Sequence, residues 1–139
     1  MNRQLESIAN ASPDSLDRLL DDLNDSLQST PIKDDEASAL VRGLSSLLEK
    51  KCGDAALESL CNVLSTLYIL GRARSEIEQI ALKKMRDLPV GAVVHMLEVV
   101  GLSEISTKRE LLSSYAQHEN AYLSALAKSL LARAEHRSD

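Results

Sequence analysis

Histidine and cysteine side chains offer the most reactive chemistry in this sequence, and their spacing limits what they can do. His95 and Glu98 are three residues apart, so a helix would place both on one face as two metal ligands. A zinc site needs three or four ligands, and no other His or Cys stands at ligand spacing. We therefore interpret His95 as a surface or half-buried side chain, and we expect no bound metal and no cofactor.

The two cysteines, Cys52 and Cys61, favour structural roles. Lys50 and Lys51 stand beside Cys52 and could lower its pKa, which leaves a reactive thiol as the alternative. Cys61 falls on the apolar face of an expected helix, where it serves as a small hydrophobic residue. On one helix the two residues would lie roughly 13 Å apart along the axis, too far for a disulfide.

The sequence lacks the motifs that hold substrates in common enzyme classes. The five glycines stand apart and form no phosphate-binding loop, and neither a G-x-S-x-G nor an H-E-x-x-H pattern occurs. We therefore expect a protein that is not an enzyme and whose function depends on its surface.

Composition predicts one all-α domain. The 139 residues suffice for a single core, and with no Trp or Phe and only three Tyr that core must be aliphatic, which suits packed helices. No apolar run reaches the roughly 20 residues of a membrane span, and the N-terminus contains no apolar segment typical of a secretory signal. Because only two cysteines occur, we expect a reducing, cytoplasmic location.

Hydrophobic periodicity and helix-ending residues predict about seven helices. They cover residues 13–29, 34–51, 54–70, 75–88, 90–100, 106–117 and 121–137. The β-branched residues of 90–100 allow a strand as the alternative, but the length and the helical neighbours favour a helix. Short loops force neighbouring helices to run antiparallel. The prediction is a compact, HEAT-like antiparallel helical stack, or short α-solenoid.

Local signals mark the ends of several predicted helices. Ser12 and Pro13 are a typical helix start, and Ser75 with Glu78 forms a capping-box pattern. Glycines are expected to end three helices: Gly53, Gly71 and Gly101. A single domain over residues 1–139 follows, in which 1–11 and 135–139 are loosely ordered except for a partial helix through Leu5 and Ile8.

The last two predicted helices form a hairpin with a familiar pattern. Apolar side chains repeat at helical spacing on the second of them, from Tyr122 and Leu123 to Leu130 and Leu131. Its opening, NAYLSALA over residues 120–127, resembles the start of a HEAT inner helix, with Ser124 where a basic residue often stands. A single hairpin cannot bury both faces, so the resemblance implies that the upstream helices stack beneath it.

The strongest surface feature is acidic. Residues 1–36 carry nine acidic and three basic side chains, within a chain whose net charge is −5. Four aspartates on the first long helix lie off its leucine stripe and align as an acidic ridge: Asp14, Asp17, Asp21 and Asp25. Further acidic residues accompany them on this helix and open the next one: Asp22, Asp34, Asp35 and Glu36.

The acidic ridge has two interpretations. The commoner one is an ordinary solvated face. Against it, only Arg18 relieves the repulsion, like charges at helical spacing are destabilising, and Asp is a poor helix former. We therefore interpret all eight acidic residues as a docking surface for a cationic partner, which they would attract electrostatically.

A second group of charged residues is basic: Arg72, Arg74, Lys83, Lys84 and Arg86. It lacks interleaved aromatic residues for base stacking, and acidic residues stand close by. We interpret it as a mixed surface, with RNA contact as a minor alternative. The negative net charge likewise argues against direct nucleic-acid binding as the main role.

Size, acidity and helical hairpins together resemble the immunity proteins of bacterial contact-dependent growth inhibition and related polymorphic toxin systems. The resemblance implies a cytoplasmic protein without activity of its own, which binds the basic C-terminal domain of a toxin, often a nuclease. The acidic ridge would then mimic nucleic-acid phosphates and cover the active site of the toxin.

Two other functions remain open. A helical-repeat adaptor would bind a protein or peptide on the concave face of the stack, near Tyr115, Tyr122 and Lys128, with little role for residues 14–36. A helical regulator would hold a small molecule under Tyr68 and Met96, for which the sequence contains no specific signal.

Overall fold

The computed structural model describes residues 2–50 and 52–137, and within them the chain forms eight α-helices, a short 3₁₀ helix and no strand. The helices are α1 (Asn2–Ala9), α2 (Pro13–Ser29), α3 (Asp34–Leu48), α4 (Asp54–Ile69), α5 (Arg74–Lys84), η1 (Met85–Asp87), α6 (Val90–Leu102), α7 (Lys108–Ala116) and α8 (Ala121–Arg137). The predicted all-α class is confirmed.

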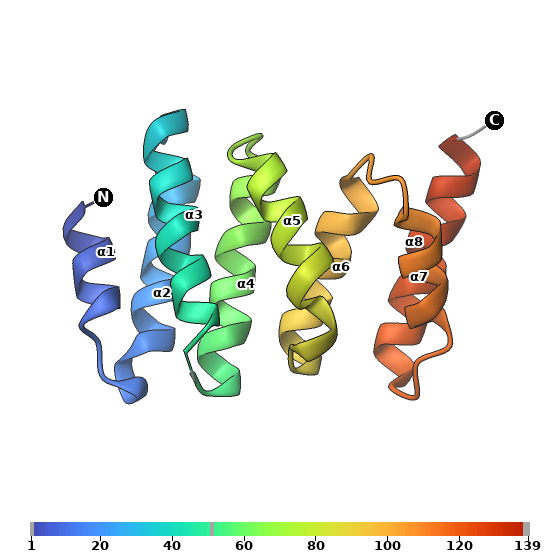
Figure 1. The fold of residues 1–139 in the computed structure, drawn as a ribbon, viewed down its shortest axis with the longest axis horizontal. Helices are drawn as coiled ribbons and strands as arrows, with labels where there is room; N and C mark the ends of the chain where they lie inside the picture. The colour runs from blue at the N-terminus through green and yellow to red at the C-terminus, as the bar shows by residue number, and fades with distance from the viewer. Residues whose placement is uncertain (1, 51, 138–139) are drawn as a thin grey trace.

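The helices form an antiparallel stack in two layers. Consecutive helices run in opposite directions and follow one another along the long axis of the molecule, from α1 at one end to α7 and α8 at the other (Figure 1). In the even layer, α2 packs on α4, α4 on α6 and α6 on α8. In the odd layer, α1 packs on α3 and α3 on α5, while α7 packs on α6 and α8. The predicted helical stack is therefore confirmed.

The core lies between the layers and is almost entirely aliphatic. Helix α4 is its centre, because it contacts α2, α3, α5 and α6. Leu60, Leu64 and Leu67 of α4 are fully buried, in agreement with the apolar surface expected of a central helix. Ile69 and Leu70, at the C-terminal end of α4, are exposed. No helix in the described part of the chain is long and apolar enough to cross a membrane.

Helix α6 confirms the helical prediction for residues 90–100. It packs between α4 and α8. Gly101 lies inside α6 and does not end it, so that prediction was wrong. A Cβ atom on Gly101 would meet Leu130 Cδ2 of α8 at 2.7 Å. The glycine therefore allows α6 and α8 to approach closely.

Helix α4 ends as predicted at Gly71, whereas the helix end predicted at Gly53 differs. Gly71 has a φ of 78°, and the Arg72 N–H donates to the Leu67 carbonyl at 2.9 Å, as in a Schellman motif. Helix α3 ends at Leu48, and Gly53 instead directly precedes α4.

The predicted capping box at Ser75 was wrong. Helix α5 begins at Arg74, so Ser75 is already helical and cannot act as a cap. Ala73, with a φ of 51°, precedes the helix. The turn after Gly71 is so tight that the chain becomes helical before Ser75.

Helices α7 and α8 confirm the predicted hairpin. Asn120 begins α8 through its side-chain Oδ1, which accepts a hydrogen bond from the Leu123 N–H at 3.1 Å. Tyr122, predicted in the apolar stripe, is 65% exposed, so that assignment was wrong. Helix α8 is the last of its layer, and no further described helix covers this side of it.

At the other end of the stack, α1 extends over the segment where the sequence indicated a partial helix. Ile8 is buried, and Gln4 Nε2 donates to Ser26 Oγ of α2 at 3.1 Å. At the C-terminus α8 extends to Arg137, while Ser138 and Asp139, also expected to be loosely ordered, lie outside the described residues.

Candidate functional site

The acidic ridge lies on α2, on the side opposite to the core contacts of this helix. The side chains that α2 buries are Leu16, Leu20, Leu23, Asn24 and Leu27. At about 100° per residue, the ridge aspartates project from the opposite side. Asp14, Asp21 and Asp25 are exposed, and Asp17 is half-buried. The structure therefore brings the four ridge residues together on one solvent-facing side of a single helix.

Asn24 fixes the orientation of this helix in the even layer. Its Oδ1 atom accepts a hydrogen bond from Thr66 Oγ1 of α4 at 2.5 Å, and the Asn24 side chain is buried. The hydrogen bond specifies which flank of α2 turns toward α4. The ridge consequently points away from the core, and the rigid helix holds its carboxylates in a fixed order.

The negative charge of α2 is not neutralised locally. The helix carries five aspartates and one basic residue, Arg18. None of these side chains forms an ion pair within 4 Å with any described residue. Such like charges at helical spacing cost about 0.2–0.5 kcal/mol for each adjacent pair. The field of the ridge is therefore directed into the solvent.

Helices α4 and α6, which follow α2 in the even layer, also carry acidic side chains. Asp54 and Glu58 lie on α4 and Glu98 lies on α6, and neither helix contains a Lys or an Arg. Together α2, α4 and α6 carry eight acidic side chains and a single basic one. The absence of Lys and Arg from residues 54–69 and 90–102 was the signal that could have identified this extension.

Glu58 occupies the boundary between α4 and α6. A Cβ atom built on Gly91 would meet its Oε2 atom at 2.5 Å. The carboxylate therefore lies over the backbone of α6, in space that any side chain at position 91 would occupy. Gly91 thus provides room for the Glu58 carboxylate at the contact between α4 and α6.

The three acidic residues at the start of α3 are placed differently from the ridge. Asp34 forms an ion pair with Arg72, with 2.6 Å between Oδ1 and Nη1. Asp35 accepts a hydrogen bond from the backbone N–H of Glu36, and Glu36 accepts one from the backbone N–H of Lys33. These side chains stabilise the N-terminus of α3, where negative charge is favourable. The charge of Asp34 is compensated, in contrast to the charge of the ridge.

Three of the five basic residues between positions 72 and 86 form individual local interactions. Arg72 pairs with Asp34, and Lys84 pairs with Glu49 at 2.7 Å between Nζ and Oε1. Arg74 lies over the Tyr68 ring, with 4.9 Å from its Cζ to the ring centroid, and donates to the Tyr68 carbonyl. Arg72 and Lys84 therefore link this segment to α3, and Arg74 links it to α4, which is consistent with a mixed surface.

Neither cysteine has the environment of a nucleophile. Cys61 is buried, and burial raises the pKa of its thiol to about 12. Burial also raises the pKa of Cys52, and the opposing effect of Lys50 is smaller. The described surroundings of Cys52 therefore do not favour an activated thiol, and Lys51, the second lysine considered beside it, lies outside the described residues. His95 is half-buried, and the described residues contain no group of three or more His, Cys, Asp or Glu side chains arranged to hold a metal ion.

Tyr68, near which a small-molecule pocket was considered, belongs to the packed core. Its hydroxyl donates to Glu78 Oε2 at 2.5 Å, and the side chain is 2% exposed. Burial, and then the hydrogen bond to Glu78, raise the pKa of Tyr68 above its ordinary value. Met96 is fully buried. Both residues are therefore structural.

The fold and this surface define a class of protein: an all-α helical stack in which the first three helices of one layer, α2, α4 and α6, carry mainly acidic side chains. Searches of protein-family models, of curated proteins and of solved structures find no match to the chain. Its function must therefore be inferred from the surface itself.

Proposed function

We propose that this chain is a non-catalytic immunity protein that neutralises a cationic toxin domain. The proposed partner is the C-terminal domain of a bacterial toxin, with a nuclease as its expected activity and the cytoplasm as the place of action. One observation carries the proposal: the ridge aspartates of α2 face solvent without ion pairs to described residues, in a layer whose first three helices carry eight acidic side chains and one basic one.

The geometry of the ridge suits a nuclease active site. A nuclease binds the phosphates of its substrate with Lys and Arg side chains in a cleft. From Asp14 to Asp25 the ridge extends roughly 16 Å along a straight helix. This row of carboxylates would occupy the positions of consecutive phosphates and exclude the substrate. Because the helix is already ordered, binding would not require a folding step.

Electrostatic attraction would make this association fast and sensitive to salt. Unpaired charges of one sign increase the association rate at low ionic strength, and a Debye length of about 8 Å at physiological salt reduces that effect. Glu58 and Glu98 would extend the contact beyond α2, and Asp34 would contribute little because Arg72 already neutralises it.

An adaptor that binds a protein or peptide on the concave face of the stack is the second candidate, and exposed apolar residues favour it. Ile69 of α4, Leu102 of α6 and Tyr122 of α8 are 59%, 47% and 65% exposed. Exposed apolar side chains such as these can anchor a protein contact. Tyr115 cannot take part as expected, because it is buried against α8 and stacks on His118.

The two candidates differ in their dependence on the ridge, and affinity capture from the source cell distinguishes them. The wild-type chain serves as bait, beside a ridge variant in which Asp17, Asp21 and Asp25 are replaced by Lys. An immunity protein should capture one basic domain at equal stoichiometry, and should release it at high salt or when the ridge is reversed. Purified wild-type chain should then suppress the activity of that domain.

A matched variant controls for net charge. Glu76, Glu104 and Glu119 are exposed and lie outside α2, so their replacement by Lys changes the net charge by the same amount. This variant should capture the partner as the wild type does. Undiminished capture by the ridge variant would refute the acidic-ridge mechanism and favour the adaptor.

A further inference from the structure

A groove between the C-terminal halves of α6 and α8 forms a second potential binding site, separate from the acidic ridge. Its volume is about 330 Å³, at the lower end of the range typical of small-molecule sites. Leu102 of α6 and Leu126 and Leu130 of α8 supply its apolar walls. Leu102 is 47% exposed, although a large apolar side chain is usually buried.

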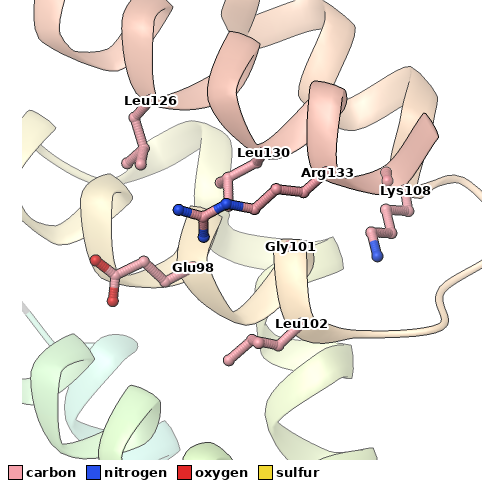
Figure 2. Close-up of a pocket in the computed structure, with 8 residues that line it drawn as sticks. Glu98, Gly101, Leu102, Lys108, Leu126, Leu130 and Arg133 are labelled. Carbon is pink, nitrogen blue, oxygen red and sulfur yellow. The ribbon is translucent and has the colours of Figure 1, made fainter. Parts of the chain in front are cut away.

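Two cations and one anion surround the leucines. Figure 2 shows the Arg133 side chain extending from α8 across the groove, with Lys108 and Glu98 on opposite sides of it. The Arg133 guanidinium makes no ion pair or hydrogen bond with any described residue. Lys108, at the start of α7, donates from Nζ to the Ser103 carbonyl at 3.0 Å, which holds its charge at this end of the groove. Lys108 therefore makes the side of the groove toward α7 positive, while the Arg133 guanidinium extends toward Glu98.

The lining also restricts the chemistry of the ligand. No lining side chain carries a hydroxyl or an amide group. The backbone N–H groups of α6 and α8 inside the groove are used within the helices. Only the charged groups of Glu98, Lys108 and Arg133 could pair with the amides of an extended peptide in this groove. A hydrocarbon chain needs no such partners.

We propose that the α6–α8 groove binds a medium-chain fatty acid in its carboxylate form. The carboxylate pairs with the Arg133 guanidinium, which can form two parallel hydrogen bonds to it, and Lys108 adds positive charge on the side of the groove toward α7. The hydrocarbon chain follows Leu102, Leu130 and Leu126, and covers apolar surface of Leu102 and Leu126 that is otherwise in contact with water. Glu98, on the other side of Arg133, weakens binding through its like charge.

Calorimetric titration of the full chain with sodium decanoate, below its micelle concentration, tests the proposal. We expect saturable binding of one decanoate per chain, and much weaker binding of decanol, which lacks the carboxylate. Chemical-shift changes in the wild-type chain should be confined to the residues of the groove. This second readout does not depend on any variant folding correctly.

Three substitutions test the roles of the charges. Arg133→Gln should weaken decanoate binding about tenfold, because it removes a charge-assisted pair. Glu98→Gln should strengthen it severalfold. Lys128→Gln changes the same charge on an exposed part of α8 outside the groove, and should leave affinity within about twofold.

Several results would overturn the proposal. These are no saturable binding at millimolar decanoate, shift changes elsewhere in the chain, or equal effects of Arg133→Gln and Lys128→Gln. Tighter binding of a short leucine-terminated peptide than of decanoate would refute the fatty acid as the ligand.

Discussion

The hydrogen bond between Thr66 and Asn24 should contribute measurably to the stability of the even layer. Thr66 Oγ1 donates to Asn24 Oδ1 at 2.5 Å, and Asn24 is 7% exposed. Thr66→Val keeps the shape of the side chain and removes only the donor. The described part of the chain contains no buried side-chain N or O atom without a hydrogen-bond partner. The variant would therefore leave Asn24 Oδ1 buried without this partner.

The expected loss follows from the energetics of buried polar groups. A hydrogen bond contributes about 0.5–1.5 kcal/mol net, and an unsatisfied buried acceptor costs about 1–3 kcal/mol. Thr66 is only half-buried, so some water can reach the site, and Val adds apolar surface that offsets part of the loss. We expect the free energy of unfolding to fall by about 1.5 kcal/mol, and Tm to fall by about 5 °C in a domain of this size.

Urea unfolding followed by circular dichroism measures this loss, with Thr30→Val as the matched control. Thr30 is exposed and its side chain makes no hydrogen bond with a described residue, so its replacement should change stability by less than about 0.5 kcal/mol. The urea dependence of the unfolding free energy should be the same for all three proteins. If Thr66→Val and Thr30→Val were equally stable, the hydrogen bond would not position α2 on α4.

Two further predictions concern the packing and the titration of the core. Gly101→Ala should destabilise the chain by about 1–2 kcal/mol, because Leu130 fills the space of the new Cβ. Gly91→Ala should be neutral or slightly stabilising, because the exposed Glu58 carboxylate can move aside. Thermal unfolding of both variants checks this prediction, and an equal loss of stability in the two variants would contradict it. Burial raises the pKa of Tyr68, so the folded chain keeps a proton that the unfolded chain loses above about pH 10. The contribution of Tyr68 to the free energy of unfolding should be complete below about pH 10 and decline above it. In urea unfolding, Tyr68→Phe should therefore lose less stability at alkaline pH than the wild type. An identical alkaline loss in both proteins would contradict this prediction.

Much of the fold could be predicted because helix signals in this chain are local. Leucines at helical spacing and Pro13 defined α2, and Gly71 defined the end of α4. Errors arose where tertiary contacts decided the outcome. Gly101 appeared as a helix end in the sequence, but it allows contact with Leu130, which is distant in sequence. Tyr122 is apolar enough for a core, but it lies on a side of α8 that no described helix covers.

The candidate surface was predictable only in part. The acidic ridge follows from spacing within one helix, so residues 14–25 could be grouped from the sequence. The sequence could not show that Asp34 differs from these residues, because the Arg72 side chain that pairs with Asp34 comes from a turn that is distant in sequence. The extension over Glu58 and Glu98 depends on the order of helices in the even layer, which only the packed structure reveals.

The central claim is that the acidic ridge binds a cationic toxin domain. The most direct test measures the affinity of the captured, purified domain for the wild-type chain and for the triple variant of Asp17, Asp21 and Asp25 to Lys, with matching far-UV circular dichroism spectra to confirm that both are folded. We predict that reversal of the ridge raises Kd by at least a thousandfold, because close charge pairs contribute up to several kcal/mol. The triple variant of Glu76, Glu104 and Glu119 to Lys should bind as the wild type does. Equal affinity of the ridge variant and the wild type would contradict the proposed function.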